Sequence, residues 1–312
     1  MTCDQKHLIS KPGFGFAAAG RTVRRTLATA IVAIAAWGAP ALAQPAIWTV
    51  KDADSTIYLL GTVHLLKPDT QWKTDKLETA LNAAQELWLE LPTTNPEEMA
   101  GEMMSLVTQY GLSPAKPLST DLTPEEMATL DEAAKLAGLT GPQLNIFRPW
   151  FAALTISTAA ITHAGFDPAS GVDGKIEAAF KARGIKPKGL ETAEQQIKVF
   201  ANLTRDEELA FLRTTIDEYK NASTELDKLV DVWARADVAA LEDIFVTEMK
   251  SVSPSLYAAI LPNRNANWTV KIEDMLKGKG VIFIAVGAGH LIGEDSVLAM
   301  LKAKGIDSER VQ

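Results

Sequence analysis

The sequence has 312 residues, 31 of them basic and 39 acidic, and 47% of them hydrophobic. Its formal net charge of −8 at pH 7 is unfavourable for binding nucleic acid or an anionic membrane surface. The single cysteine, Cys3, excludes a fold held together by disulfides. A chain of this length can instead be stabilised by its own hydrophobic core.

The first 43 residues have the order of a secretory signal peptide. Three arginines between positions 21 and 25 precede an almost wholly apolar run from Leu27 to Ala36. Ala41-Leu42-Ala43 then gives the small-x-small pattern of a cleavage site. The apolar run is shorter than the ~20 residues that span a bilayer, which disfavours an uncleaved anchor. Arg24-Arg25 is a weak twin-arginine pattern, so the sequence does not separate Sec from Tat export.

We therefore expect a periplasmic or secreted protein that begins at Gln44. Residues 44–312 keep 26 basic and 38 acidic residues, a formal net charge of −12. We expect no nucleic-acid partner, and no later segment is long and apolar enough to span a membrane. Cys3 is removed with the signal, which leaves no thiol chemistry. This length suits one large domain or two small ones, and we predict one.

The start of the mature chain has the pattern strand, strand, helix, strand. The apolar and β-branched runs Ile47–Val50 and Thr56–Leu60 predict two strands joined by a polar turn. Thr74–Ala84 has apolar residues at helical spacing. Glu86–Leu91 (ELWLEL) predicts a buried strand that ends at Pro92.

The middle of the chain is mostly helical. A capping Thr123 followed by Pro124 predicts a helix that Gly138 closes. Further helices are predicted over residues 149–162 and 172–183, and residues 204–250 have a helical pattern with acidic faces. A short strand is predicted at 188–191.

The end of the chain returns to mixed structure. A helix over 265–276 precedes Val281–Val286 (VIFIAV), a continuous apolar strand of the kind that is covered on both faces. A helix over 295–304 and a short edge strand near Arg310-Val311 follow. The fold class is therefore α/β (α+β): one mixed central sheet built from both ends of the chain, with a large helical insertion at about 96–260.

Two Gly-x-x-His segments, Gly61–His64 and Gly287–His290, follow apolar strands from opposite ends of the chain. Ligands of open α/β sheets bind outside the carboxyl ends of strands, and imidazole is the commonest neutral metal ligand. The alternative is a pair of hydrogen-bonded structural histidines at a sheet edge. His163 ends an apolar helix, where a structural histidine is ordinary.

Glu90 lies between Leu89 and Leu91 in the predicted buried strand. A buried carboxylate needs a cationic partner or a metal. Together with the two histidines, Glu90 would complete a site for a divalent metal, for which Zn²⁺ is one candidate. The alternative is an ion pair with a nearby Arg or Lys.

Further polar residues stand at predicted helix starts. Arg264, followed by Asn265, can grip a carboxylate or phosphate with two parallel hydrogen bonds, or form a structural salt bridge. Asp173 and Glu191 follow short apolar turns and are either helix caps or site carboxylates. Gln195 lies one turn after Glu191 and is expected to share its helix face.

The ordered set of these motifs resembles the TraB/GumN family, which includes the pheromone-shutdown protein PrgY and the animal Tiki proteases. The resemblance covers nearly the whole mature chain. The matching residues are Tyr58–His64, Leu89–Leu91, Arg148–Trp150, Gly171–Asp173, Gly189–Thr192 with Gln195, Arg264-Asn265 with Trp268, and Val286–Leu291 with Gly293.

The resemblance implies a metal-dependent hydrolase that acts on peptides, with Mn²⁺ or Co²⁺ as the metal. His64, Glu90 and His290 would hold the metal or act on its water, and Arg264 would steady an oxyanion or a substrate carboxylate. One departure is that Leu91-Pro92 stands where the family often has an acidic residue. Two alternatives remain: a non-enzymatic binding or accessory protein of cell-envelope or polysaccharide assembly, and hydrolysis of a non-peptide ester or amide. The sequence gives no oligomeric state.

Overall fold

The computed structural model describes residues 43–92 and 96–312, which belong to one compact unit. The predicted signal peptide lies outside the described residues, apart from Ala43. Within the two described ranges, no helix combines the length and the apolar character that crossing a bilayer requires.

A six-stranded mixed sheet forms the centre of the described residues, in the order β4-β3-β5-β2-β1-β6. Strand β5 runs parallel to β2 on one side and to β3 on the other, whereas β1 is antiparallel to β2 and β6. The strands are β1 (Ile47–Lys51), β2 (Ser55–Thr62), β3 (Glu86–Leu89), β4 (Lys188–Gly189), β5 (Gly280–Gly287) and β6 (Ser308–Arg310).

The predicted α/β class and mixed sheet are confirmed, with two adjustments. Five strands come from the two ends of the chain, but β4 comes from the helical middle and extends the sheet at the β3 edge. Strand β3 is shorter than predicted, since it ends at Leu89. Glu90 therefore lies just beyond the strand, where its side chain is free to turn toward the edge of the sheet.

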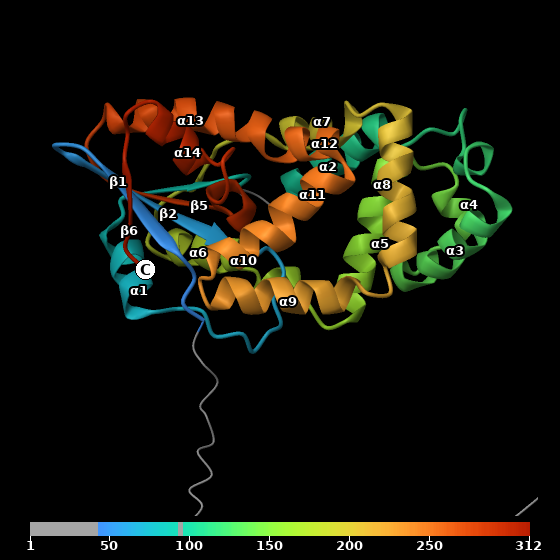
Figure 1. The fold of residues 1–312 in the computed structure, drawn as a ribbon, viewed down its shortest axis with the longest axis horizontal. Helices are drawn as coiled ribbons and strands as arrows, with labels where there is room; N and C mark the ends of the chain where they lie inside the picture. Colours follow the sequence, from blue (N-terminus) through green and yellow to red (C-terminus); the bar gives the residue numbers. More distant parts are fainter. Residues whose placement is uncertain (1–42, 93–95) are drawn as a thin grey trace, which may run out of the picture. The chain divides into compact units, whose positions relative to one another are not determined.

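Helices cover both faces of the sheet because its strands alternate between two apolar sets. In β2, Ile57 and Leu59 belong to the core shared with α13 (Pro262–Leu276) and α14 (Val297–Ala303). Leu60 belongs to the core on the other face, which is shared with α1 (Asp75–Ala83), α6 (Val172–Ala182) and α9 (Ala222–Ala234). Figure 1 shows α13 and α14 on one side of the strands, and α1 and α6 on the other.

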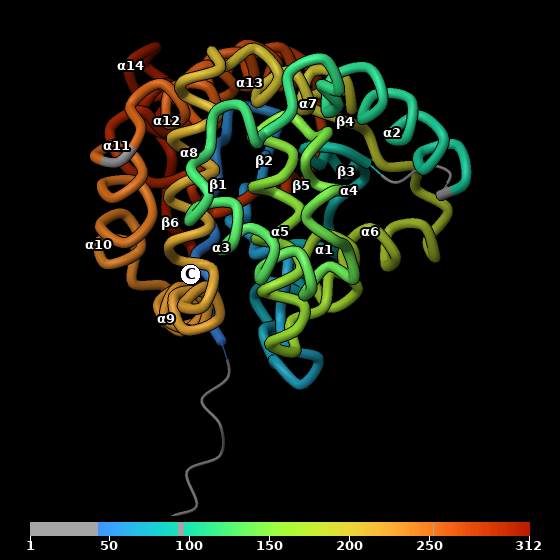
Figure 2. Tube along the Cα trace, turned by 90° about the vertical axis from the view of Figure 1, so that its right-hand side faces the viewer, coloured from blue at the N-terminus to red at the C-terminus, as the bar shows by residue number. Residues whose placement is uncertain are grey.

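The middle of the chain has a smaller core of its own. It is formed between α3 (Pro124–Ala134), α4 (Gly141–Leu144), α5 (Pro149–His163) and α8 (Arg205–Glu218). Figure 2 shows these helices gathered in front of the sheet. Thr123 and Glu126 form the capping box that starts α3, as the sequence predicts.

The remaining helices connect this insertion to the sheet. They are α2 (Pro96–Tyr110), α7 (Ala193–Ala201), α10 (Val238–Leu241), η4 (Glu242–Thr247), α11 (Glu248–Val252) and α12 (Pro254–Ile260). Short 3-10 turns are η1 (Leu118–Thr120), η2 (Lys135–Ala137), η3 (Pro168–Ser170) and η5 (Ala288–Leu291). The helical pattern predicted over 204–250 is thus divided into several helices, and η4 is a π-helical turn, a rare form that is frequent at functional sites.

Candidate functional site

The two Gly-x-x-His segments lie side by side at the carboxyl edge of the sheet. Parallel pairing of β2 and β5 places Gly61 opposite Val286 and Thr62 opposite Gly287. A Cβ on Gly61 would lie 3.0 Å from Cα and 3.1 Å from Cβ of Ala288, so the segments can pack this closely only with glycine at position 61. His64 follows the end of β2, and His290 lies in η5 directly after β5.

Glu90 lies between the two imidazoles. Its Oε1 is 3.8 Å from Nε2 of His64 and 3.7 Å from Nε2 of His290, and it accepts a hydrogen bond from the Gly287 N–H at 2.7 Å. A Cβ on Gly287 would lie 3.1 Å from His64 Nε2 and 3.2 Å from Glu90 Oε1. Glycine at position 287 therefore keeps open the space that these three groups face.

His64 is oriented by a carboxylate on α6. Its Nδ1 donates to Asp173 Oδ2 at 2.8 Å, and the Thr62 hydroxyl donates to the other oxygen of Asp173 at 2.7 Å. This leaves His64 Nε2 directed at Glu90. Desolvation by the surrounding residues lowers the pKa of His64, but Asp173, with a smaller effect from Glu90, outweighs it and raises that pKa to about 9.

His290 is oriented by an amide on α13 and is buried, with 4% of its surface exposed. Its Nδ1 donates to Asn265 Oδ1 at 2.6 Å, because the Asn265 amide nitrogen donates to the Asp295 backbone carbonyl at 2.8 Å and leaves Oδ1 as the acceptor. The ring also packs on Trp268, with centroids 4.2 Å apart. Burial, reinforced by the charge of Arg264, lowers the pKa of His290 to about 3, so the imidazole is neutral near pH 7.

Arg264 joins these groups and uses all five of its N–H donors. Nε and Nη2 donate to the two oxygens of Glu191 at 3.0 and 2.6 Å, and Nη2 also donates to Glu90 Oε2 at 2.5 Å. Nη1 donates to the Ile260 carbonyl and to Nε2 of His290, each at 3.1 Å. The salt bridge that was the alternative role for Arg264 and the ion pair that was the alternative role for Glu90 are therefore one network.

The two glutamates on Arg264 differ in their electrostatics. Burial by itself raises the pKa of Glu90, but His290, His64 and Arg264 lower it to about 2, so this carboxylate stays ionised. Burial raises the pKa of Glu191 above its usual range despite its pairing with Arg264. Glu90 is thus suited to accepting hydrogen bonds or a cation, rather than to taking up a proton.

Some predicted positions differ from the sequence interpretation. Glu191 lies before Thr192, the N-cap of α7, so it does not share a helix face with Gln195, and that prediction was wrong. Gln195 instead completes the capping box with Thr192. Neither Asp173 nor Glu191 is a helix cap, since Gly171 and Thr192 hold those positions. His163 is exposed at the end of α5, apart from the cluster around Glu90.

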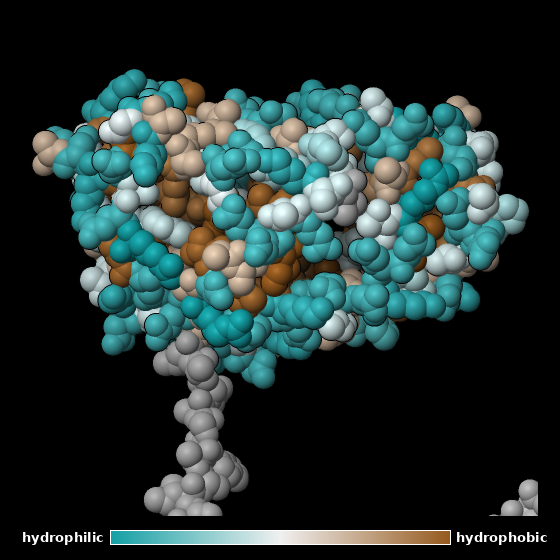
Figure 3. Space-filling view, in the orientation of Figure 1, coloured by the Kyte–Doolittle hydropathy of each residue, from teal (hydrophilic) through white to brown (hydrophobic). Residues whose placement is uncertain are grey.

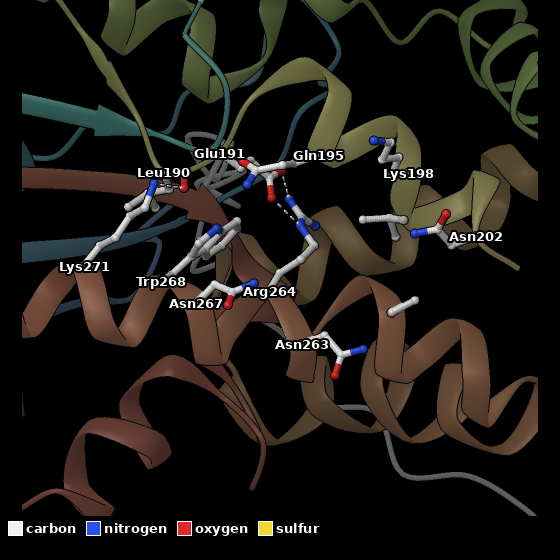
Figure 4. A pocket seen from close by; sticks show the side chains of 12 residues that line it. Leu190, Glu191, Gln195, Lys198, Asn202, Asn263, Arg264, Asn267, Trp268 and Lys271 are labelled. Carbon is white, nitrogen blue, oxygen red and sulfur yellow. Dashed lines mark hydrogen bonds and ion pairs between the residues drawn. The ribbon is translucent and has the colours of Figure 1, made fainter. Parts of the chain in front are cut away.

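Arg264 separates two cavities. On the side of the histidines lies a cavity of about 290 Å³, here termed the apolar cavity, which also contacts His64, Glu90 and His290. Its apolar walls include Ile161, Leu226, Leu229, Leu241, Phe245 and Ile260. On the other side lies a hollow of about 340 Å³ between α7 and α13, here termed the amide groove. Figure 4 shows its polar residues, which include Gln195, Lys198, Asn202, Asn263, Asn267 and Lys271.

Sequence reasoning missed several contacts that support this cluster. Phe245 carries no motif, and the motifs that contain Thr62 and Gly287 do not show that the Thr62 hydroxyl binds Asp173 or that the Gly287 N–H binds Glu90. Leu226 and Leu229 on α9 have the spacing of ordinary core residues, and only the fold brings them to the histidines. Trp268 was part of the ordered set of motifs, but its tilted contact with the His290 ring depends on the packing of α13 against the sheet.

A divalent cation is the cofactor that the resemblance implies, and the donors fit one in kind. Two imidazole nitrogens and a carboxylate oxygen are ligands that Mn²⁺, Co²⁺ and Zn²⁺ accept. The separations of 3.7 and 3.8 Å exceed by about half an ångström the ~3.3 Å between tetrahedral ligands that are each ~2 Å from one ion. In the part of the chain that the structure describes, no three His, Cys, Asp or Glu side chains are already close enough to hold an ion. The donors therefore fit a cation in kind, while Nε2 of His290 accepts a hydrogen bond from Arg264 Nη1 in this structure.

The fold and site together define a class of α/β protein in which two Gly-x-x-His segments, from opposite ends of the chain, face one buried glutamate. Residues 46–310 match the model of the TraB/PrgY/gumN family, and the chain belongs to that family. No solved structure matches the chain significantly.

Curated relatives are similar over most of their length. The chain is 25% identical to the uncharacterized protein YbaP of Escherichia coli over 260 residues, which cover 83% of this chain and 92% of YbaP. It is 23% identical to an uncharacterized protein of Treponema pallidum over 272 residues, which cover 82% of this chain and 80% of the relative. These names state no activity, so the chemistry has to be argued from the site.

Proposed function

We propose that this protein is an exported metal-dependent hydrolase that cleaves peptide bonds and uses His64, Glu90 and His290 to hold its metal. One observation carries the proposal: Nε2 of His64 and Nε2 of His290 lie 3.8 and 3.7 Å from the same oxygen of Glu90. At a pKa of about 9 His64 is protonated near pH 7, so a cation held here would displace a proton from its Nε2.

The outer partners of both rings support this role. Asp173 binds Nδ1 of His64, and Asn265 binds Nδ1 of His290, so each ring keeps Nε2 for the shared space. Metal-binding histidines usually have such a partner on the second nitrogen, which fixes the tautomer and the ring orientation. A divalent cation held here would supply a Lewis acid and the means to activate water at neutral pH.

The protein's own groups have distinct tasks in such a reaction. Glu90 is ionised and serves as a ligand, because a pKa of about 2 makes it a poor proton acceptor. Glu191 holds the guanidinium of Arg264 through two of its donors. Nη1 is the donor of Arg264 directed at His290, so it is the one that can engage a developing oxyanion when the imidazole has another partner.

Export is proposed from residues 1–43. Their arginines, apolar run and Ala41-Leu42-Ala43 have the order of a cleaved signal peptide. A periplasmic or secreted location is part of the proposal. N-terminal sequencing of the protein recovered from the producing cell tests it: a mature chain starting at Gln44 supports export, and a chain starting before Leu27 contradicts it.

A digest of a peptide library tests the proposed activity. The protein is incubated with Mn²⁺, Co²⁺ or Zn²⁺, and products are identified by mass spectrometry. We expect cleavage with at least one of these metals, and its loss in His64→Ala and His290→Ala. His163→Ala is the matched control, since this exposed histidine lies outside the site, and it should keep full activity. Absence of cleavage with every metal contradicts the proposal.

A second candidate is a binding protein without turnover that serves as an accessory of cell-envelope or polysaccharide assembly. One observation favours it: every donor of Arg264 is engaged, and Nη1 occupies Nε2 of His290. Because protein groups already satisfy this network, it needs no metal, and a ligand would bind in the apolar cavity beside it. Ligand binding that persists in the presence of a chelator, together with no cleavage in the digest, would support the binding protein over the enzyme.

A further inference from the structure

The apolar cavity has walls that are unusual for a site full of charges. Ile161, Leu226, Leu229, Phe245 and Ile260 are each only partly buried, although all are large and apolar. Figure 3 shows hydrophobic side chains gathered around a hollow between α9 and the α10–α11 segment. Partly exposed apolar side chains that converge on a concave surface mark a binding site for an apolar group.

The charged groups lie together at one part of this cavity. His64, Glu90, Arg264 and His290 are its charged or titratable lining residues, and the rest of the wall is formed by apolar side chains, Thr62 and the glycine-rich segment after β5. Glu90 already pairs with Arg264. A charged ligand group placed against the apolar walls would lose its hydration and find no partner on those walls, whereas an apolar group loses nothing there.

Phe245 connects this wall to the histidine loop. A Cβ on Gly289 would collide with the ring of Phe245, so the ring rests directly on the backbone next to His290. Phe245 belongs to the π-helical turn η4. Its wider turn points side chains in other directions than a regular α-helix does. The apolar cavity thus shares a wall with the segment that carries His290.

The size of the cavity and its neighbour narrow the ligand class. About 290 Å³ holds the volume of roughly ten waters at ~30 Å³ each, which is room for one large side chain but not for a long acyl chain. Across Arg264 lies the amide groove, with exposed Gln195, Asn202, Asn263 and Asn267. Side-chain amides both donate and accept, as a peptide main chain requires.

We propose that the apolar cavity is a specificity pocket that binds a leucine- or phenylalanine-sized side chain of a peptide, next to the bond presented to Glu90 and the two histidines. The placement of the pocket next to a cleaved bond rests on the proposed function. Binding of a side chain in the pocket does not require turnover. Leu229, on the α9 wall, limits the size of the peptide side chain that fits. Phe245 limits it from the wall beside His290.

Peptide binding to a variant that cannot cleave its substrate tests the pocket separately from the proposed hydrolase activity. The probes are blocked pentapeptides, acetyl-Gly-Gly-X-Gly-Gly-amide, with X as Leu, Phe, Ser or Asp, titrated calorimetrically into His290→Ala. We expect Leu and Phe to bind at least tenfold more tightly than Ser and Asp. Adding Leu229→Trp, which fills the cavity, should remove this preference. Val270→Trp is the matched control, since Val270 is 53% exposed on α13 and does not line the cavity.

The second measurement compares the residues preferred in cleavage by the wild-type protein and by Leu229→Ala. The Leu229→Ala change enlarges the pocket and should shift the preferred residue toward Trp. Equal binding of all four peptides, or an unchanged preference in both folded Leu229 variants, overturns the pocket. Octanoate binding that depends on Leu229 while no peptide binds also overturns it. Cleavage without side-chain preference rejects the pocket but supports the hydrolase. Peptide binding that depends on Leu229, without cleavage, supports the pocket but rejects the hydrolase.

Discussion

Nη1 of Arg264 lies 3.1 Å from Nε2 of His290. Arginine can only donate, so Nε2 accepts, and the proton of this imidazole resides on Nδ1 beside Asn265. His290 is therefore a neutral ring whose Nε2 lone pair is taken by Arg264. The same arginine also neutralises Glu90 through its Oε2, so one residue holds both His290 and Glu90 in place.

Replacing Arg264 should destabilise the protein. Arg264→Ala leaves Glu90 and Glu191 buried without a cation, which typically costs ~3–5 kcal/mol of the free energy of unfolding. Arg264→Lys keeps the charge but not the fork, and we expect a loss of ~1–3 kcal/mol. Urea unfolding followed by tryptophan fluorescence measures both. Arg235→Lys, at an exposed pair with Asp231, should change stability by less than ~0.5 kcal/mol; equal effects at both arginines would contradict the network.

Asp173 should matter for metal affinity rather than for folding. Asp173→Asn keeps the shape but weakens the hold on Nδ1 of His64, and loss of such an outer partner typically lowers metal affinity 10–100-fold. Calorimetric titration with Mn²⁺ measures the change. Asp227→Asn removes an exposed carboxylate that pairs with Lys67 and should leave the affinity as it is. An Asp173→Asn protein with wild-type affinity would show that Asp173 has no orienting role.

Gly287 should be needed for space and not for backbone conformation. Its φ of −50° suits any residue, but a Cβ would lie 3.1 Å from His64 Nε2 and 3.2 Å from Glu90 Oε1. We expect Gly287→Ala to fold and to lose metal binding. Gly174→Ala in α6, where a Cβ meets nothing within 4 Å, should keep the metal and gain up to ~1 kcal/mol of stability. Metal binding that survives in Gly287→Ala would place the ion elsewhere.

The pH dependence of stability tests the packing of the helical insertion. The hydrogen bond from Arg205 lowers the pKa of Asp121 below its usual range. A lowered carboxyl pKa contributes stability above the unfolded pKa of ~3.9, and that contribution is lost as pH falls through the folded value. Asp121→Asn should therefore be less stable than the wild type by ~0.5–1 kcal/mol at pH 7, and the difference should shrink as pH falls through the folded pKa of Asp121. A difference that persists at low pH would contradict the ion pair.

The sequence predicted the frame of the protein because the relevant signals are local. The apolar run from Val281 to Val286 indicated a central strand, and β5 is indeed the third of six. Thr123 and Gly138 marked the limits of a helical segment through capping and a positive φ, which are determined by a few neighbouring residues. The same locality explains why strand β4 was found as a short strand but not placed in the sheet.

The sequence predicted which residues form the site better than it predicted the contacts between them. Sequence spacing and the family resemblance singled out His64, Glu90, His290 and Arg264, and the structure brings all four together. No spacing in the sequence shows that Arg264 uses all five of its N–H donors inside the cluster. Pairing between β2 and β5, and the crossing of α9 over the histidines, are long-range features, so the apolar cavity had no signature in the sequence.

Cobalt absorbance tests the central claim most directly. Co²⁺ is titrated into metal-free protein, and its visible spectrum reports the ligands without any need for turnover. We predict saturation at one equivalent in the wild type and in His163→Ala, and loss of the spectrum in His64→Ala, His290→Ala and Glu90→Gln. A wild-type protein that binds no Co²⁺, or a spectrum that persists in both folded histidine variants of the site, would contradict a metal held by the paired Gly-x-x-His segments.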